Sequence, residues 1–338
     1  MVNHSGLMAA GFSYGPPNGI GVAAGTSATM TAIAGNFGGY PAEFDAASFT
    51  GAIEFPSLND SGRWMFKVRF ANNQSVTGVF MVEGVGPAQT VARWGQSIGD
   101  PFPAGSVLRP IASGLGLPYL QPRINEQGDG LFSAMVARGG AETERAYLAG
   151  SPGRLRTLIR AGVTEAVNAP GVRPTLAFDD YQSISPGLGW NDLGQVALVD
   201  ASPGTAGPIF AYDPIVGLVV LGRIGIPIDV RPGDRRTPSR FSLFGTMPPI
   251  RPYASGLSHR GVLAFAANFS DGTGAVFRTV VRCDADLDGD GFTDFFDLVA
   301  FVDAFEGGEP RADFNGDGFI DFFDFDAFVG AFERGCGL

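Results

Sequence analysis

Two short acidic stretches near the C-terminal end carry the most specific chemistry in this chain. Oxygen-bearing side chains fall at positions 1, 3, 5, 9 and 12 of a loop that starts at Asp286, and the same pattern recurs in a second loop that starts at Asp313. Position 6, where such a loop turns sharply, is Gly291 or Gly318. A hard cation needs six to eight oxygen ligands, which a short loop supplies by alternating them. Two tandem matches favour a pair of calcium loops over acidic surface turns.

The two loops predict two calcium ions with parallel sets of ligands. Side chains act at positions 1, 3, 5 and 12, a backbone carbonyl acts at position 7, and position 9 acts through a water. Position 12 is Asp in both loops, where most EF-hands use Glu, so bidentate reach is shorter. The expected ligands are Asp286, Asp288, Asp290, Phe292, Asp294 and Asp297 in the first loop, and Asp313, Asn315, Asp317, Phe319, Asp321 and Asp324 in the second.

A helical pattern of apolar residues follows each loop, and Gly307-Gly308 with Pro310 ends the first helix. Two calcium loops ending in Asp, each followed by one helix, resemble a type I dockerin. The closing Glu333-Arg334-Gly335-Cys336 resembles the Gly-Cys-ending variant of exported bacterial proteins. The resemblance covers residues 283 to 338. It implies a small α domain of EF-hand-like loops that folds with calcium and docks onto a cohesin-type or cell-surface receptor.

Two phenylalanine pairs, Phe295-Phe296 and Phe322-Phe323, occupy loop positions 10 and 11. In dockerins these positions belong to the face that meets cohesin, although Ser and Thr are more usual there. Adjacent helical residues point about 100° apart, so one Phe of each pair is expected to pack inward and the other to anchor a partner.

The acidic module, residues 283 to 338, differs in charge from the rest of the chain. It holds 12 Asp and 3 Glu against Arg311 and Arg334, a net charge of −13, whereas the whole chain is −11 and residues 1 to 282 sum to about +2. The acidity therefore belongs to the calcium loops, and nucleic acid is not an expected partner.

Cys283 and Cys336 are the only cysteines, and they bracket the acidic module. A disulfide between them would stabilise it by about 4 kcal/mol in the chain-entropy model; two buried free thiols are the alternative. Such a bridge and the calcium loops predict an extracytoplasmic, secreted or cell-surface location. The start of the chain contains no recognisable signal peptide, so export implies a processed chain or a late start codon. No apolar run reaches the roughly 18 residues of a membrane span.

Residues 1 to 282 are rich in Gly and Pro, and their short apolar runs predict a mainly β domain. An internal repeat recurs four times at nearly constant spacing, each copy continuing into an apolar strand. Second strands are centred on Phe80, Tyr147, Phe210 and Phe277, and three copies have a third strand. The repeated segments are Leu58-Asn59-Asp60-Ser61-Gly62, Ile124-Asn125-Glu126-Gln127-Gly128, Trp190-Asn191-Asp192-Leu193-Gly194 and Leu257-Ser258-His259-Arg260-Gly261.

The fourth copy lacks a third strand, and residues 29 to 35 resemble the missing one. A chain that begins with the strand its last unit lacks is expected to close a ring, so we expect a four-bladed β-propeller-like domain closed by the N-terminus. A β-solenoid or a pair of sandwiches is the alternative. The repeat also resembles the Asn-x-x-Gly tandem repeats of exported bacterial proteins with interchangeable C-terminal anchors. Its Asn and Gly favour a turn over a ligand site.

Catalytic motifs are scarce: the chain has only His4 and His259, no nucleophile elbow and no phosphate loop. Asp179-Asp180 could be half of a glycosidase carboxylate pair, but a surface role is favoured. Two functions remain. The favoured one is an exported, non-catalytic display or binding protein with a docking module. The alternative is a glycoside hydrolase or polysaccharide lyase subunit, because dockerins usually tether polysaccharide-degrading domains, and carbohydrate is then the expected ligand.

Overall fold

The computed structural model describes fourteen segments of the chain, separated by short gaps. Its described part is mainly β, with a small helical part at the C-terminal end, as the sequence predicts. The described residues are 7–14, 19–26, 29–35, 57–69, 77–109, 122–139, 141–176, 188–200, 206–244, 256–258, 261–281, 285–287, 293–315 and 318–334.

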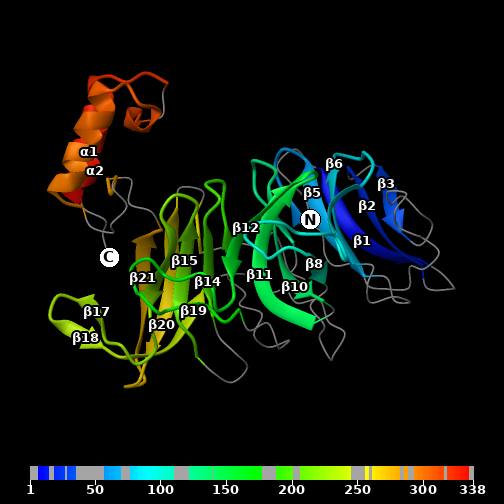
Figure 1. The fold of residues 1–338 in the computed structure, drawn as a ribbon, viewed down its shortest axis with the longest axis horizontal. Coiled ribbons are helices and arrows are strands. Elements are labelled where there is room, and N and C mark those ends of the chain that lie inside the picture. The colour runs from blue at the N-terminus through cyan, green and yellow to red at the C-terminus, as the bar shows by residue number, and fades with distance from the viewer. Residues whose placement is uncertain are drawn as a thin grey trace.

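Five antiparallel sheets follow one another along the long axis of the molecule, and we call them units 1 to 5 (Figure 1). A two-stranded hairpin, β17 (Ile228–Arg231) and β18 (Asp234–Arg236), lies between units 4 and 5 in the chain order. Unit 1 holds β1 (Met8–Tyr14), β2 (Gly19–Gly25) and β3 (Met30–Gly35); unit 2 holds β4 (Ser57–Leu58), β5 (Arg63–Arg69), β6 (Thr77–Glu83) and β7 (Gln89–Arg93); unit 3 holds β8 (Ser106–Arg109), β9 (Arg123–Ile124), β10 (Gly130–Arg138), β11 (Ala141–Ser151) and β12 (Arg154–Arg160); unit 4 holds β13 (Gly189–Trp190), β14 (Val196–Val199), β15 (Ile209–Asp213) and β16 (Gly217–Gly222); unit 5 holds β19 (Pro238–Leu243), β20 (Val262–Phe269) and β21 (Gly274–Val280).

The repeated motif forms the turn that leads into β5, β10, β14 or β20, which confirms the turn prediction. The Gly62, Gly128, Gly194 and Gly261 N–H groups each donate to the carbonyl three residues earlier, at 3.1–3.3 Å. All four glycines have φ between +73° and +85°, a region in which a Cβ is disfavoured. The strands predicted around Phe80, Phe210 and Phe277 form as β6, β15 and β21.

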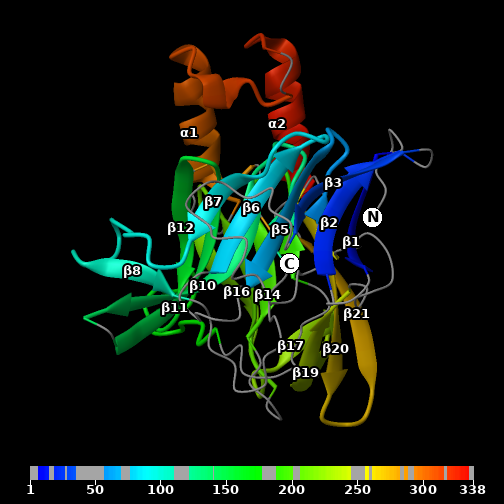
Figure 2. The same ribbon diagram turned by 90° about the vertical axis from the view of Figure 1, so that its right-hand side faces the viewer.

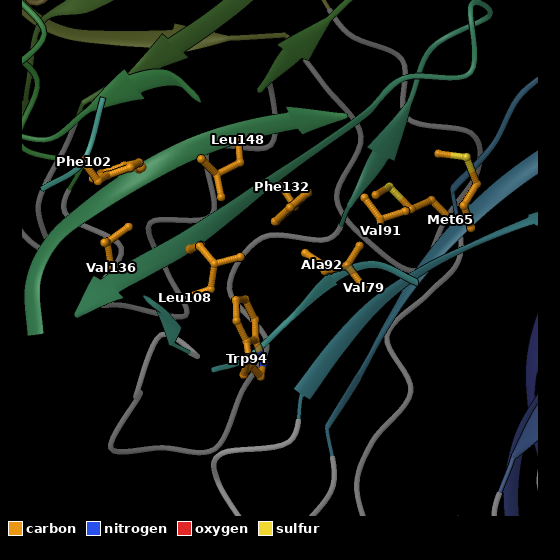
Figure 3. Packing of buried hydrophobic residues seen from close by; sticks show 13 residues of the cluster. Met65, Val79, Val91, Ala92, Trp94, Phe102, Leu108, Phe132, Val136 and Leu148 are labelled. Atoms are coloured by element: carbon orange, nitrogen blue, oxygen red, sulfur yellow. The ribbon is translucent and has the colours of Figure 1, made fainter. Parts of the chain in front are cut away.

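Hydrophobic cores lie between consecutive units, because successive side chains of a strand point to opposite faces. Between units 2 and 3, Met65 and Val79 from one sheet meet Phe132 and Leu148 from the next (Figure 3). Trp94 and Leu108 extend this core toward the loop between the two units. Separate clusters of the same kind join unit 3 to unit 4 and unit 4 to unit 5.

The predicted closure of a ring by residues 29 to 35 is wrong. β3 pairs with β2, in the register Gly21↔Gly35 to Gly25↔Met30, and not with β21. Figure 1 places unit 1 and unit 5 at opposite ends of the row of sheets. The physical reason is that β3 completes its own sheet: β1, β2 and β3 repeat the order of the long strands in units 2, 3 and 4. The count of four units therefore omitted a fifth.

The helical part contains α1 (Phe295–Glu306), a 3-10 turn η2 (Pro310–Ala312) and α2 (Phe322–Arg334). The two helices lie side by side (Figure 2) and pack through the Phe301 and Phe328 rings, whose centroids are 4.1 Å apart and whose planes are 2° from parallel. Gly307 caps the end of α1, and Gly308 has φ +63°, as the sequence predicts. A helix follows each acidic loop, which confirms the predicted loop-helix order.

Candidate functional site

The carboxylates at loop position 12 are completely buried at the starts of the two helices. Asp297 accepts N–H bonds from Leu287 at 2.6 Å and from Asp294 at 2.8 Å. Asp324 accepts equivalent bonds from Asn315 at 3.0 Å and from Asp321 at 2.8 Å. Each carboxylate thus ties the beginning of its loop to the beginning of its helix. Because a carboxylate has about four lone-pair positions, both oxygens keep capacity for a cation.

The carboxylates at position 9 serve as helix N-caps. Asp294 accepts the N–H of Phe296 at 2.8 Å, and Asp321 accepts the N–H of Phe323 at the same distance. In the first loop Asp294 and Asp297 form a reciprocal capping box. These bonds place two carboxylates at the positive end of each helix dipole. The interaction with the dipole is favourable for each carboxylate.

In the second loop, the side chain at position 1 accepts a hydrogen bond from the sharp turn. Asp313 Oδ2 accepts the N–H of Gly318 at 2.9 Å, so it points across the loop that a cation would fill. The N–H groups of Asn315 and Asp321 lower the pKa of Asp324, so this buried side chain is held as an anion, the form that binds metal.

Several predicted ligands lie outside the described residues, namely Asp288, Asp290, Phe292 and Asp317. Within the part of the chain that the structure describes, no three His, Cys, Asp or Glu side chains lie close enough to hold a metal ion. The other predicted ligands are described and flank those gaps: Asp286, Asp294 and Asp297 in the first loop, and Asp313, Asn315, Phe319, Asp321 and Asp324 in the second.

All four paired phenylalanines are exposed, so the prediction that one of each pair packs inward is wrong. Phe295 and Phe296 are 67% and 65% exposed, and Phe322 and Phe323 are 71% and 67% exposed. The rings of each pair contact edge to face, with centroids 6.2 Å and 6.4 Å apart. The reason is that the helices pack through later turns, around Phe301 and Phe328. The first turns project beyond this core.

The repeat turns are joined to one another by a ladder of asparagine side chains that sequence reasoning missed. The Nδ2 group of Asn59 donates to the Asn125 carbonyl at 2.8 Å, and Asn125 Nδ2 donates to the Asn191 carbonyl at 3.0 Å. Asn191 Nδ2 donates to the Ser258 carbonyl at 3.0 Å. The Oδ1 atoms meanwhile hold their own turns, as in the bond from Asp129 N–H to Asn125. The constant interval of the motif was the available signal.

A second row of bonds runs beside the asparagine ladder. Both carboxylate oxygens of Glu126 accept the N–H of Asp60, at 2.8 and 3.0 Å, and Asp192 accepts the N–H of Glu126 at 2.7 Å. The acidic side chains after Asn125 and Asn191 therefore connect their units to the preceding ones. This geometry assigns the motif a structural role.

Residues 2–281 match the model of a protein family of unknown function, DUF7453. The chain belongs to this family. No curated protein matches the chain. Among solved structures, TolB from Acinetobacter baumannii is similar over 81% of this chain and 63% of its own, less than two thirds of its length, with 12% identity and a TM-score of 0.25. The alpha-L-arabinanase of Penicillium chrysogenum, complexed with arabinobiose, is similar over 83% of this chain and 74% of its own, with 13% identity and a TM-score of 0.31.

The buried carboxylates of the DUF7453 region make structural bonds. Asp200 accepts the Thr175 N–H at 2.6 Å and contacts its hydroxyl. Asp213 accepts from Gln195 Nε2 at 2.7 Å and from the backbone N–H of Ile215 at 2.8 Å. Asp179-Asp180, His4 and His259 lie outside the described residues, as do Cys283 and Cys336. No helix among the described residues is long and apolar enough to cross a membrane.

Proposed function

We propose that this DUF7453 protein is an exported, non-catalytic binding or display protein whose C-terminal module, residues 283 to 338, is dockerin-like. Calcium folds this module, and the module docks onto a cohesin-type or cell-surface receptor. The observation that carries the proposal is the pair of exposed phenylalanines at the start of each helix, Phe295-Phe296 and Phe322-Phe323. Four large apolar side chains in water are costly unless a partner covers them.

Two calcium ions would be held by the two sets of loop oxygens, with Asp297 and Asp324 at position 12. Their fit rests on the donor set: each of these carboxylates is buried and accepts a backbone N–H bond from the second or third residue of its loop. A bound cation supplies the charge that offsets the clustered carboxylates, which repel one another without it.

The Phe pairs occupy equivalent positions on two similar helices, so they offer two related anchors for one receptor site. A disulfide between Cys283 and Cys336 would tie the ends of the module together, consistent with an extracytoplasmic location. The repeat units form a propeller-like stack of blades that presents this module. The structural roles of Asp200 and Asp213 support a non-catalytic stack over a hydrolase or lyase.

Titration calorimetry on the full chain tests the calcium part, after treatment with chelator. Two calcium ions are expected to bind, and the double variant Asp297→Asn with Asp324→Asn is expected to lose at least tenfold in affinity. A parent that binds no calcium overturns the proposal.

The docking part is tested with a purified type I cohesin and with the variant in which all four phenylalanines are Ser. The variant is expected to keep calcium binding and lose capture. Loss of calcium binding together with capture would make these rings part of the core. Capture unchanged by the four substitutions would exclude them from the docking face. Hydrolysis of a plant or algal polysaccharide by the parent would favour the enzyme alternative.

A further inference from the structure

Among the described residues, the last sheet of the stack lacks a strand that each earlier sheet has, and we propose that its open edge receives an extended strand from a partner polypeptide. In units 1 to 4 an outer strand, β3, β7, β12 or β16, pairs with the edge of β2, β6, β11 or β15. In unit 5 that edge belongs to β21, and among the described residues no backbone bond reaches its outer side. Open edges are templates for strand addition.

The four outer strands share a feature that a strand added beside β21 is expected to have as well. At one point of the pairing, each outer strand has one residue more than the neighbouring strand, which shifts the register there. The extra residue is aliphatic every time: Ile33, Val91, Leu158 or Leu221. Val91 and Leu158 are only 4% and 6% exposed, whereas Leu221 of unit 4 packs against the unit 5 core but is only partly buried. An added strand beside β21 would lie next to Leu221.

The side chains of β21 are exposed where their counterparts are buried. When the units are aligned on Phe80, Phe210 and Phe277, Val276 corresponds to Val79 and Ile209, both completely buried, yet Val276 is 69% exposed. Phe277 corresponds to Phe80 and is likewise only partly buried. Unit 5 is therefore open at its outer edge and on its outward face.

A sixth repeat unit is not the expected occupant. Units 2, 3 and 4, each followed by another unit, carry Asn in their turns, and its Nδ2 group donates to the next unit. Unit 5 has Ser258 in this place. Its hydroxyl accepts the Val262 N–H at 3.0 Å, but its side chain has no amide group that could extend the ladder. β3 is excluded as well, since it is already paired with β2. Every described strand already belongs to a sheet, so we assign this place to a single strand from another chain.

Arg278 specifies the chemistry of that strand. It occupies the place of Ala211 in unit 4, which lies opposite Val219 of the outer strand. A partner residue at the Val219 place would face the exposed arginine, and a Glu or Asp there would form a favourable cross-strand pair. The partner strand is thus aliphatic, with one extra residue opposite Val276 and Phe277, and it carries an acidic residue opposite Arg278.

The test uses labelled peptides with the sequence of residues 214–225, which contain β16, added to the full-length protein. The peptide with Val219→Glu is expected to bind roughly two- to tenfold more tightly than its matched control with Val219→Arg. Fluorescence anisotropy measures the affinity. Hydrogen exchange is expected to show new protection at alternate amides of β21.

A charge swap separates this site from non-specific binding. In the protein variant Arg278→Glu, whose substitution is on the surface, the preference is expected to reverse in favour of the Arg peptide. Equal binding of the two peptides, no binding of either, or protection outside β21 would overturn the proposal. It does not depend on the calcium module, whose variants are expected to bind the peptides as the parent does.

Discussion

Substitution of Asn125 by Ser tests whether the asparagine ladder holds the units together. Serine keeps a hydroxyl that can accept the turn bond, as Ser258 does in unit 5, but it removes the Nδ2 donor to the Asn191 carbonyl. The Asn191 carbonyl still accepts the Gly194 N–H, so it is not orphaned. The expected loss is therefore that of one hydrogen bond, about 0.5–1.5 kcal/mol in the free energy of unfolding.

Substitution of Asn125 by Ala removes the turn bond as well. The Asp129 N–H, now 2.9 Å from Asn125 Oδ1, then loses its acceptor, which adds about 1–3 kcal/mol. Alanine is thus expected to cost roughly 1.5–4.5 kcal/mol in total. The matched control is Ser258→Ala, which deletes an exposed turn bond without touching a ladder donor, and it is expected to cost less than about 1 kcal/mol.

Urea unfolding followed by tryptophan fluorescence is a suitable assay. The Trp190 Nε1 group of unit 4 donates to the Asp129 carbonyl of unit 3 at 3.1 Å, so this indole reports on the junction that the ladder spans. Circular dichroism should give the same midpoint if the stack unfolds as one unit. A Ser variant within about 0.3 kcal/mol of the parent, beside a strongly destabilised Ala variant, would refute the ladder and leave only the turn.

Two further predictions concern packing and pH. A Cβ at Gly130 would collide with the Met65 sulfur at the junction of units 2 and 3, so Gly130→Ala is expected to cost about 1–3 kcal/mol. The double variant Gly130→Ala with Met65→Ala should lose less stability than the two single variants lose in sum. A double-mutant cycle in urea measures this difference, and strict additivity would contradict the contact. The Gly171 N–H and the Arg173 guanidinium hold the pKa of Glu165 below its ordinary value, so this carboxylate stabilises the fold above its unfolded-state pKa and loses that contribution on acidification. Glu165→Gln is expected to be less stable than the parent at pH 7, with the difference vanishing as the pH falls through the folded-state pKa; a difference unchanged at pH 3 would contradict this.

Sequence reasoning succeeded where the controlling physics is local. A glycine at positive φ after an Asn turn is recognisable in one copy, and the alternating apolar residues after it predict a strand. The helices after the loops follow from capping and periodicity in the same way. These signals placed β5, β14 and β20 within a few residues of their observed bounds.

Contacts between units could not be predicted from the sequence of a single repeat. The Asn59 amide bonds the Asn125 carbonyl of the next unit, and only the stacking of sheets brings the two together. Unit 1 was missed for a related reason. The segment Asn3-His4-Ser5-Gly6 precedes β1, but it lies closer to Asn59 along the chain than Asn59 lies to Asn125, and so it breaks the spacing that revealed the other copies.

The inward packing of one Phe in each pair failed for a geometric reason. The prediction treated the first turn of each helix as part of the helix pair. The observed core is formed by residues two turns further on, such as Phe301 and Phe328, while the first turn holds the buried carboxylates Asp297 and Asp324. The start of each helix is therefore occupied by loop chemistry, and its neighbouring aromatic rings are left in water.

Two departures from the repeat coincide in unit 5, the last unit before the helical part. Among the described residues, the ladder stops at Ser258 and no outer strand pairs with β21. Val281 belongs to the unit 5 core, and Ala285 belongs to the helical core. An open edge and an acidic, aromatic module are thus held at one end of the molecule. A receptor that supplied both a strand for β21 and a site for the Phe pairs would bind them at high effective concentration, so the two contacts would reinforce each other without any new interaction. Arg278→Glu is accordingly expected to speed dissociation of such a receptor even though it leaves the Phe pairs intact.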